Sequence, residues 1–157
     1  MLRRSPPPDP APGSIHRLMV ASEGRKIHHS VIVRALELAR PNHASVFVMS
    51  IARIWGTGLG FPNPGLLPSK REWDEQRLIV REAVSAFEKA GFDADGLVLA
   101  TRRARKRIVG EATARKMDAI VMGAEARRSL LGDFAWSQEP HRVARRSKGI
   151  PVVLVPL

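Results

Sequence analysis

Apolar residues along the chain fall into two patterns, short continuous runs and longer stretches with helical spacing. The continuous runs are typical of parallel strands that are covered on both faces of a sheet. They occupy residues 15–21, 44–54, 96–101, 119–123 and 150–156. Stretches in which apolar positions recur every three to four residues predict helices. They occupy residues 29–40, 69–90 and 105–117, and a last helix is expected at 137–147.

Strands and helices therefore alternate along the chain. This order is typical of an α/β protein with a single five-stranded parallel sheet, doubly wound and Rossmann-like, with helices on both faces. Right-handed crossovers place the carboxyl ends of all strands at one edge, and ligands bind where the strand order reverses. The loops after the first and fourth strands, residues 21–28 and 123–137, are the candidate site.

Local signals fix several ends of these elements. Pro41 ends the first helix, Ser69 and Glu72 have the spacing of a capping box, and Gly91 follows the second helix as a C-cap. Residues 55–68 are rich in glycine and proline, which predicts a long loop.

The chain is the size of one domain, with 157 residues of which 44% are apolar. Residues 1–14 carry five prolines and little to bury, so we expect a disordered tail followed by one domain over 15–157. Cysteine is absent, and no apolar run is long enough for a membrane helix. We therefore expect a soluble, cytoplasmic protein with no membrane partner.

The chain is strongly basic, because 26 Lys and Arg residues against 15 Asp and Glu give a formal net charge of +11. Such a surface attracts polyanions, whereas the lack of tyrosine leaves few stacking platforms for single strands. Residues 102–107 hold five cations in six positions. They either clamp phosphate or an acidic partner at the end of the third strand, or form a solvated turn.

Four segments of the chain resemble the universal stress protein family: "LMVASEG" at 18–24, "VIVRALELAR" at 31–40, "DAIVMGA" at 118–124 and "VARRSKGIPVVLV" at 143–155. The resemblance implies a strand order of 3-2-1-4-5 and pairing into dimers. It also implies, for one branch of the family, ATP held at the ends of strands one and four. Another branch does not bind ATP.

The nucleotide-binding branch carries G-x2-G-x9-G-S/T, in which glycine lets backbone N–H groups approach phosphate and the hydroxyl adds a donor. Here Gly123 matches the first glycine and Ser137 the hydroxyl, but Ala126 and Trp136 replace the other two glycines. ATP-binding members also show Asp-Gly after strand one, where this chain has Glu23 and Gly24. We therefore expect a degenerate adenine-nucleotide site with weak or absent ATP binding.

The candidate binding residues follow from these two loops and the end of strand two. Arg127 is included because a guanidinium group could take over contacts that glycine N–H groups no longer make. In an ATP site, Glu23 would lie near the base or ribose, Met49 would line the pocket, and Gly123 would meet phosphate. The full set is Ala21, Ser22, Glu23, Met49, Met122, Gly123, Ala126, Arg127 and Ser137.

No Ser-His-Asp arrangement or metal-ligand spacing supports catalysis, and the neighbouring His28 and His29 point about 100° apart on a helix, so they do not converge on one ion. We expect a non-enzymatic binding or regulatory module of the stress response. The alternatives are a genuine ATP-binding member of the family and a basic nucleic-acid-associated protein. A homodimer is expected through the last strand, an uncharged edge bracketed by Pro151 and Pro156.

Overall fold

Five parallel strands form one sheet in a computed structural model that describes residues 9–11, 13–54, 67–124 and 149–157. The strand order is β3-β2-β1-β4-β5, so the predicted doubly wound fold is confirmed. The order reverses between β1 and β4, where Leu18 pairs with Ala119 and Val20 with Val121. The strands are β1 Arg17–Ser22, β2 Ser45–Arg53, β3 Ala94–Thr101, β4 Ala119–Ala124 and β5 Val152–Pro156.

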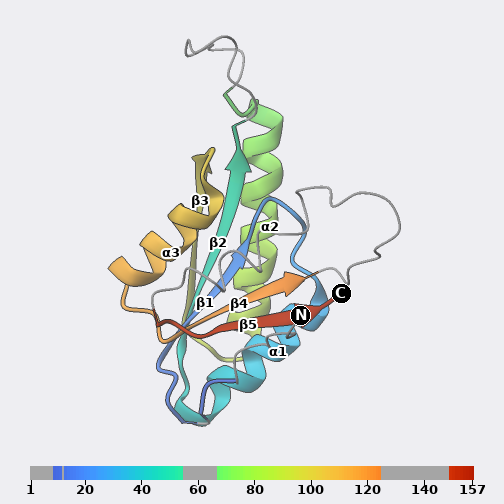
Figure 1. Ribbon diagram of the computed structural model, residues 1–157. Helices are drawn as coiled ribbons and strands as arrows, with labels where there is room; N and C mark the ends of the chain where they lie inside the picture. Colours follow the sequence, from blue (N-terminus) through green and yellow to red (C-terminus); the bar gives the residue numbers. More distant parts are fainter. Residues whose placement is uncertain (1–8, 12, 55–66, 125–148) are drawn as a thin grey trace, which may run out of the picture.

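The described helices cover the two faces of the sheet unequally. They are α1 His29–Ala39, α2 Lys70–Lys89 and α3 Ala104–Ala114, with a short 3-10 turn η1 at Arg40–Asn42. Figure 1 shows α3 on one face of the twisted sheet, with α1 and α2 on the other. Because successive strand residues point to opposite faces, Val20 and Val48 join the core under α1 and α2, whereas Met19 and Met49 join the core under α3.

The long helix α2 begins and ends as its sequence predicts. The Ser69 hydroxyl accepts from the Glu72 N–H at 3.2 Å, and the Glu72 carboxylate accepts from the Ser69 N–H at 3.1 Å, which completes the capping box. At the other end, Gly91 has φ +89°, and the Phe92 N–H donates to the Phe87 carbonyl at 3.0 Å. This left-handed turn is inexpensive for glycine and closes the helix.

Several ends differ from the prediction by one to three residues. The third strand begins at Ala94 rather than 96, and α3 ends at Ala114 rather than 117. The helix stops because Lys116 adopts φ +54° and Met117 donates back to the Ala112 carbonyl at 2.9 Å. This is the same closing turn as at Gly91, but without the glycine that would reveal it in a sequence.

Other predictions fall outside the described residues. They are the last helix at 137–147, most of the 55–68 loop and the first eight residues of the tail. Of the tail, Asp9 forms an ion pair with Arg34 of α1, and both side chains are partly exposed. In the part of the chain that is described, no helix is both long and apolar enough to cross a membrane.

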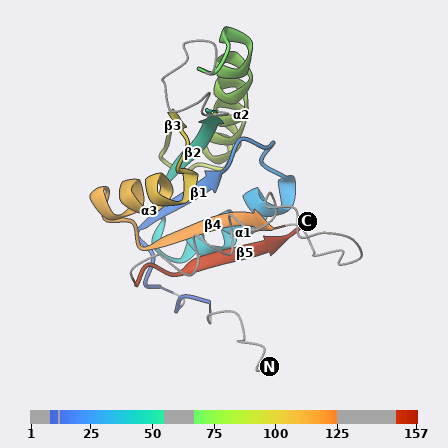
Figure 2. The ribbon, with the colours of Figure 1, turned by 45° about the horizontal axis from the view of Figure 1, so that its top comes forward.

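The sheet has two outer strands, β3 and β5, and the second lies beside β4 at the far edge (Figure 2). The Ile120 N–H donates to the Pro151 carbonyl at 2.9 Å and the Leu157 N–H to the Ala124 carbonyl at 3.1 Å. Because the polar groups of successive strand residues point alternately to either side, those of Leu154 point away from β4. The outer edge of β5 therefore presents backbone groups with no partner strand among the described residues.

Candidate functional site

The β1–α1 loop closes on itself directly after the first strand. The Ser22 hydroxyl accepts from the Arg25 N–H at 3.1 Å and donates to the Arg25 carbonyl at 2.5 Å. Gly24 has φ +100°, and a Cβ on it would lie 2.8 Å from the Ile51 carbonyl oxygen of β2. Only glycine fits this close approach without strain, so the Gly24 of the sequence pattern is explained by the fold itself.

Glu23 at the tip of β1 is buried, with 8% of its surface exposed, and it forms an ion pair with Arg53 at the end of β2. The Arg53 Nη2 lies 2.9 Å from the Glu23 Oε2, and the Arg53 Nε donates to the Glu23 carbonyl at 3.2 Å. The acid that the sequence places beside a base or ribose is thus already held by a guanidinium group. The pair therefore holds the Glu23 carboxylate in place beside the hollow.

Gln76 of α2 ties the same corner to the second strand. Its amide Nε2 donates to the Gly24 carbonyl at 2.9 Å, and its Oε1 accepts from the Ser50 hydroxyl at 2.5 Å. Both Gln76 and Ser50 are buried. We call the set Glu23, Gly24, Ser50, Arg53 and Gln76 the Glu23 corner.

Gln76 and Arg53 were not predicted as site residues. A sequence signal for Gln76 does exist, because it lies three residues after Trp73 and four before Val80, on the helix face that was predicted to be apolar. A polar residue within such a stripe must find a buried partner. Arg53 offered no comparable signal, since its partner Glu23 is 30 residues away.

A hollow lies at the point where the strand order reverses. Its accessible volume is about 40 Å³. Five predicted site residues line it together: Ala21, Ser22, Glu23, Met122 and Gly123. The structure therefore brings the carboxyl ends of β1 and β4 together, as the sheet topology requires. A second hollow, with an accessible volume of about 250 Å³, lies on the other side of Glu23, between the carboxyl end of β2 and the first turns of α2.

Four of the predicted site residues are not placed in this hollow. Met49 is fully buried in the core under α3, on the same face of the sheet as Ala21 and Met122. It does not line the hollow. Ala126, Arg127 and Ser137 lie outside the described residues, as does Trp136.

Leu157 also lines the hollow, and the sequence did not predict it. A Cβ added to Gly123 would lie 3.0 Å from the Leu157 Cδ1, so the leucine side chain lies directly over this glycine. The Leu157 N–H donates to the Ala124 carbonyl at 3.1 Å, which holds the residue beside the end of β4. Gly123 thus provides room for Leu157 as well as for any ligand.

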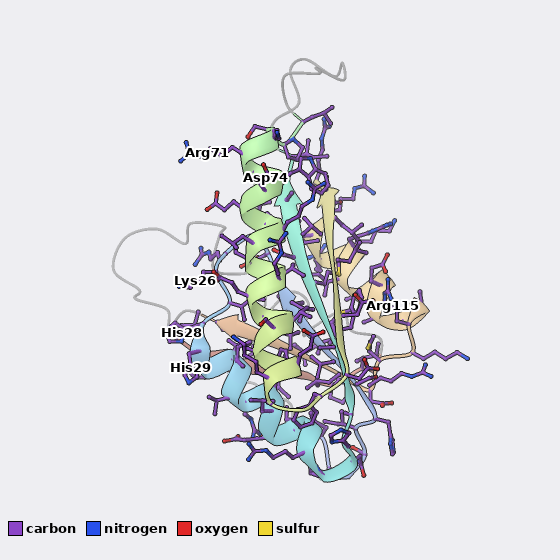
Figure 3. The ribbon with its side chains drawn as sticks, turned by 180° about the vertical axis from the view of Figure 1, so that it is seen from behind. Lys26, His28, His29, Arg71, Asp74 and Arg115 are labelled. Carbon is purple, nitrogen blue, oxygen red and sulfur yellow. The ribbon has the colours of Figure 1, made fainter. Side chains whose placement is uncertain are left out.

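The rim of the hollow carries two cations, Arg25 and Lys26, and His28 lies beside them. Figure 3 shows Lys26, His28 and His29 together at the start of α1. His28 is the N-cap of α1, since its Nδ1 accepts from the Ser30 N–H at 3.3 Å, and no acidic residue lies in the first turn of this helix. The positive end of the helix dipole and the Lys26 ammonium group both favour an anion at this rim.

The described residues contain no group of three or more His, Asp or Glu side chains that could hold a metal ion. The histidine nearest the hollow, His28, is engaged as a helix cap with Ser30. The arrangement at the hollow can bind an anion and pack against an apolar ring or side chain. Its one described contact between a hydroxyl and an imidazole joins the Ser30 Oγ to the His28 Nδ1 at 2.9 Å, at the N-cap of α1.

The universal stress protein family model matches residues 14–156 of the chain. The chain belongs to the universal stress protein family. No curated protein sequence gives a significant match.

Solved structures of universal stress proteins share the fold. One from Archaeoglobus fulgidus in complex with dAMP is 20% identical, with a TM-score of 0.63, and the match covers 90% of this chain and 98% of that one. One from Burkholderia pseudomallei is 21% identical, with a TM-score of 0.64 and coverages of 93% and 100%. A universal stress protein in complex with cAMP is 21% identical, with a TM-score of 0.62 and coverages of 91% and 98%. At these identities the likeness establishes the fold.

Proposed function

We propose that this universal stress protein is a non-enzymatic regulatory module that binds an adenine nucleotide weakly at the carboxyl ends of β1 and β4. The observation that carries the proposal is the hollow at the strand reversal, where Ser22, Glu23, Met122 and Gly123 meet under a cationic rim. Structurally similar family members in complex with dAMP and cAMP support the ligand class. The absence of cysteine is in keeping with action in the cytoplasm.

Within this class, we expect a monophosphate to bind at least as well as ATP. Phosphate recognition by backbone N–H groups needs residues without a Cβ, and Ala126 and Trp136 stand where the nucleotide-binding pattern has glycine. Lys26 and the start of α1 offer positive charge for one phosphate group at the hollow. The β- and γ-phosphates of ATP would find few backbone N–H contacts in the altered loop. The site is degenerate in the sense that it recognises these two phosphates poorly.

Calorimetry with AMP and with magnesium-ATP tests the proposal. We expect AMP to bind with a dissociation constant in the range of about 10⁻⁵ to 10⁻³ M, a free energy of roughly 4 to 7 kcal/mol, and ATP to bind no more tightly. Lys26→Glu should weaken AMP binding severalfold, whereas Lys89→Glu, an equal charge change at the end of α2, should not. AMP and ATP should be recovered chemically unchanged after incubation.

Two outcomes would contradict this function. If ATP bound at least tenfold more tightly than AMP, the loop at 126–137 would hold phosphates despite its substitutions, and the protein would be a genuine ATP binder. If neither nucleotide bound at millimolar concentration, the hollow would not be a nucleotide site.

We also propose a homodimer in which β5 pairs with β5 of a second copy. The outer edge of β5 carries no charged residue between Ile150 and Leu157, and such an edge invites another strand. A two-fold contact closes after two subunits and therefore avoids fibres.

The position of each side chain on β5 determines which variant tests the dimer. Val153 is 6% exposed and packs in the core near α1, so Val153→Lys would damage the fold itself. Leu154→Pro instead removes an outward N–H group and should give a folded monomer, whereas Leu154→Ala keeps that group and should stay dimeric. Light scattering measures both. A wild-type protein that is monomeric at high micromolar concentration would overturn the dimer.

A further inference from the structure

The first turn of α3 is crowded with positive charge. Arg102 and Arg103 precede the helix, and Arg105, Lys106 and Arg107 fall within its first four residues. A second group follows its last turn, with Arg115 and Lys116. Positive charge at a helix N-terminus opposes the helix dipole, at a cost of about 0.3 to 1 kcal/mol for each nearby charge.

Acidic partners balance only part of this charge. Glu111, the one acid of α3, is shared by Arg107 at 3.4 Å and Arg115 at 3.2 Å. Arg115 also lies over the Phe47 ring, with its guanidinium carbon 3.8 Å from the ring centroid. Arg107 and Arg115 therefore have partners within the fold.

The other cations at the helix start have no acidic partner in the described part of the chain. We call Arg102, Arg103, Arg105 and Lys106 the α3 cation cluster. Three of the four are exposed, and the buried Nε of the half-buried Arg105 has no hydrogen-bond partner among the described residues. Folding alone does not explain this arrangement, because no contact within the described fold offsets the repulsion.

Two more features of α3 weaken the helix without a packing reason. Its N-cap position is Arg103, which makes no side-chain capping bond, although Ser, Thr, Asp or Asn would stabilise the helix by about 1 kcal/mol. Gly110 lies in the helix interior on the exposed side, and a Cβ added there would meet nothing within 4 Å. Glycine at such a position costs about 1 kcal/mol relative to alanine. Several residues that destabilise a helix, gathered on one face, are typical of a functional surface.

The chemistry of the face indicates its partner. All the apolar side chains of α3 that could anchor a protein interface are buried: Ala104, Ile108, Val109 and Ala112. The exposed large apolar residues lie on other elements: Val33, Leu67, Leu78 and Leu157. No aromatic residue belongs to residues 94–117, so bases would find no stacking platform there. These features favour the phosphates of a double helix over an acidic protein or a single strand.

We propose that the α3 cation cluster binds the phosphate backbone of double-stranded nucleic acid, without reading its sequence. The exposed cations and the uncapped start of α3 would meet consecutive phosphates, and Gly110 would allow the backbone to approach the helix closely. This surface lies across the sheet from α1 and α2, and its activity does not depend on a nucleotide in the hollow.

The test compares two variants with the same change in net charge. In the cluster variant, Arg102, Arg103, Arg105 and Lys106 are each replaced by Gln. In the control variant, Lys70, Arg71, Arg77 and Arg81 of α2 are each replaced by Gln, and all four are exposed. Figure 3 shows Arg71 on α2, in front of the sheet, whereas α3 lies behind it.

Fluorescence anisotropy then measures binding to a random duplex of DNA, a duplex of RNA, a single-stranded homopolymer and a polyglutamate peptide. With about four to five phosphate contacts, the duplex affinity should fall with a log–log salt slope of about −4, which is a loss of about 250-fold between 50 and 200 mM salt. The cluster variant should lose at least about 100-fold in affinity at low salt, and its slope should become shallower by about 3 to 4. The control variant should change less than about threefold.

The other outcomes each overturn the proposal. Equal losses in both variants would mean that only the net charge matters. A single strand or polyglutamate that binds as tightly as the duplexes would assign the surface to another kind of partner. A wild-type affinity that does not depend on salt would exclude phosphate contacts.

Discussion

The Glu23 corner and the α3 cation cluster both lie at the carboxyl ends of strands in the same sheet, yet they treat charge in opposite ways. In the Glu23 corner, the carboxylate meets Arg53 at 2.9 Å and the Gln76 amide satisfies both Gly24 and Ser50. In the cluster, four cations stand side by side without an acid of the described fold. The first arrangement stabilises a loop beside the hollow. The second lowers the stability of α3 slightly, and it is the surface for which we propose a nucleic-acid partner.

The two regions differ in solvent exposure. Buried polar groups need hydrogen-bond partners within the protein, whereas exposed charges are solvated by water and can also bind a ligand. Gln76 and Ser50 are buried, and so their hydrogen bonds are part of folding. Arg102, Arg103 and Lys106 are exposed, and so water tolerates their repulsion. Variants of the Glu23 corner should consequently change the stability of the protein, whereas variants of the α3 cation cluster should change its binding to duplex nucleic acid.

The largest expected effect on stability is that of Gln76→Leu. The change leaves the Gly24 carbonyl and the Ser50 hydroxyl without their partner, and should lower the free energy of unfolding by about 2 to 3 kcal/mol. Chemical denaturation measures the loss. Glu75→Gln, at an exposed position one residue earlier, is the control and should change it by less than about 0.5 kcal/mol. A loss below about 0.5 kcal/mol for Gln76→Leu would mean that the corner is not a stabilising network.

Arg103→Asp should act in the opposite direction on stability. An acid at the N-cap of α3 accepts from free N–H groups and complements the dipole, so stability should rise by about 1 kcal/mol. For a domain of this size the melting temperature should then increase by about 2 to 4 °C. The same variant should bind duplex nucleic acid more weakly. If stability fell while binding was kept, Arg103 would be a structural residue.

A smaller effect is expected at the hollow from Leu157→Ala. The Leu157 side chain lies over Gly123, so its truncation should widen the hollow and raise AMP affinity by about two- to tenfold, roughly 0.4 to 1.4 kcal/mol. Calorimetry provides the measurement, and duplex binding should not change. Weaker AMP binding in this variant would show that Leu157 contacts the nucleotide instead of obstructing it.

The smallest effect should come from removing residues 1–13. Their described contact with the domain includes the Asp9–Arg34 ion pair, and Asp9 is 60% exposed. Exposed pairs contribute about 0 to 1 kcal/mol, so the melting temperature should fall by no more than about 4 °C. Thermal unfolding followed by circular dichroism tests this expectation. A larger fall would show that the tail packs against the domain.

The sequence predicted the sheet well because strands buried on both faces leave continuous apolar runs, as 44–54 does for β2. Five residues of the hollow could also be predicted from the sequence, because the topology of the sheet determines which strand ends lie side by side. The sequence did not predict the Glu23–Arg53 pair or the Leu157 contact with Gly123. Both depend on side chains that are distant in sequence and meet only through the register of the strands. Met49 shares a sheet face with Ala21 and Met122, which line the hollow, but it is fully buried in the core, so its place in the site stays a prediction.

Hydrogen exchange of the wild-type protein, with saturating AMP and separately with a DNA duplex, tests most directly whether the molecule has two independent surfaces. The account predicts that AMP slows exchange at residues 22–28 and 122–124 and leaves 102–107 unchanged. The duplex should slow exchange at 102–107 and at the first turns of α3, and leave the hollow unchanged. Protection of the same segment by both ligands, or no protection of 22–28 and 122–124 by AMP, would contradict the account.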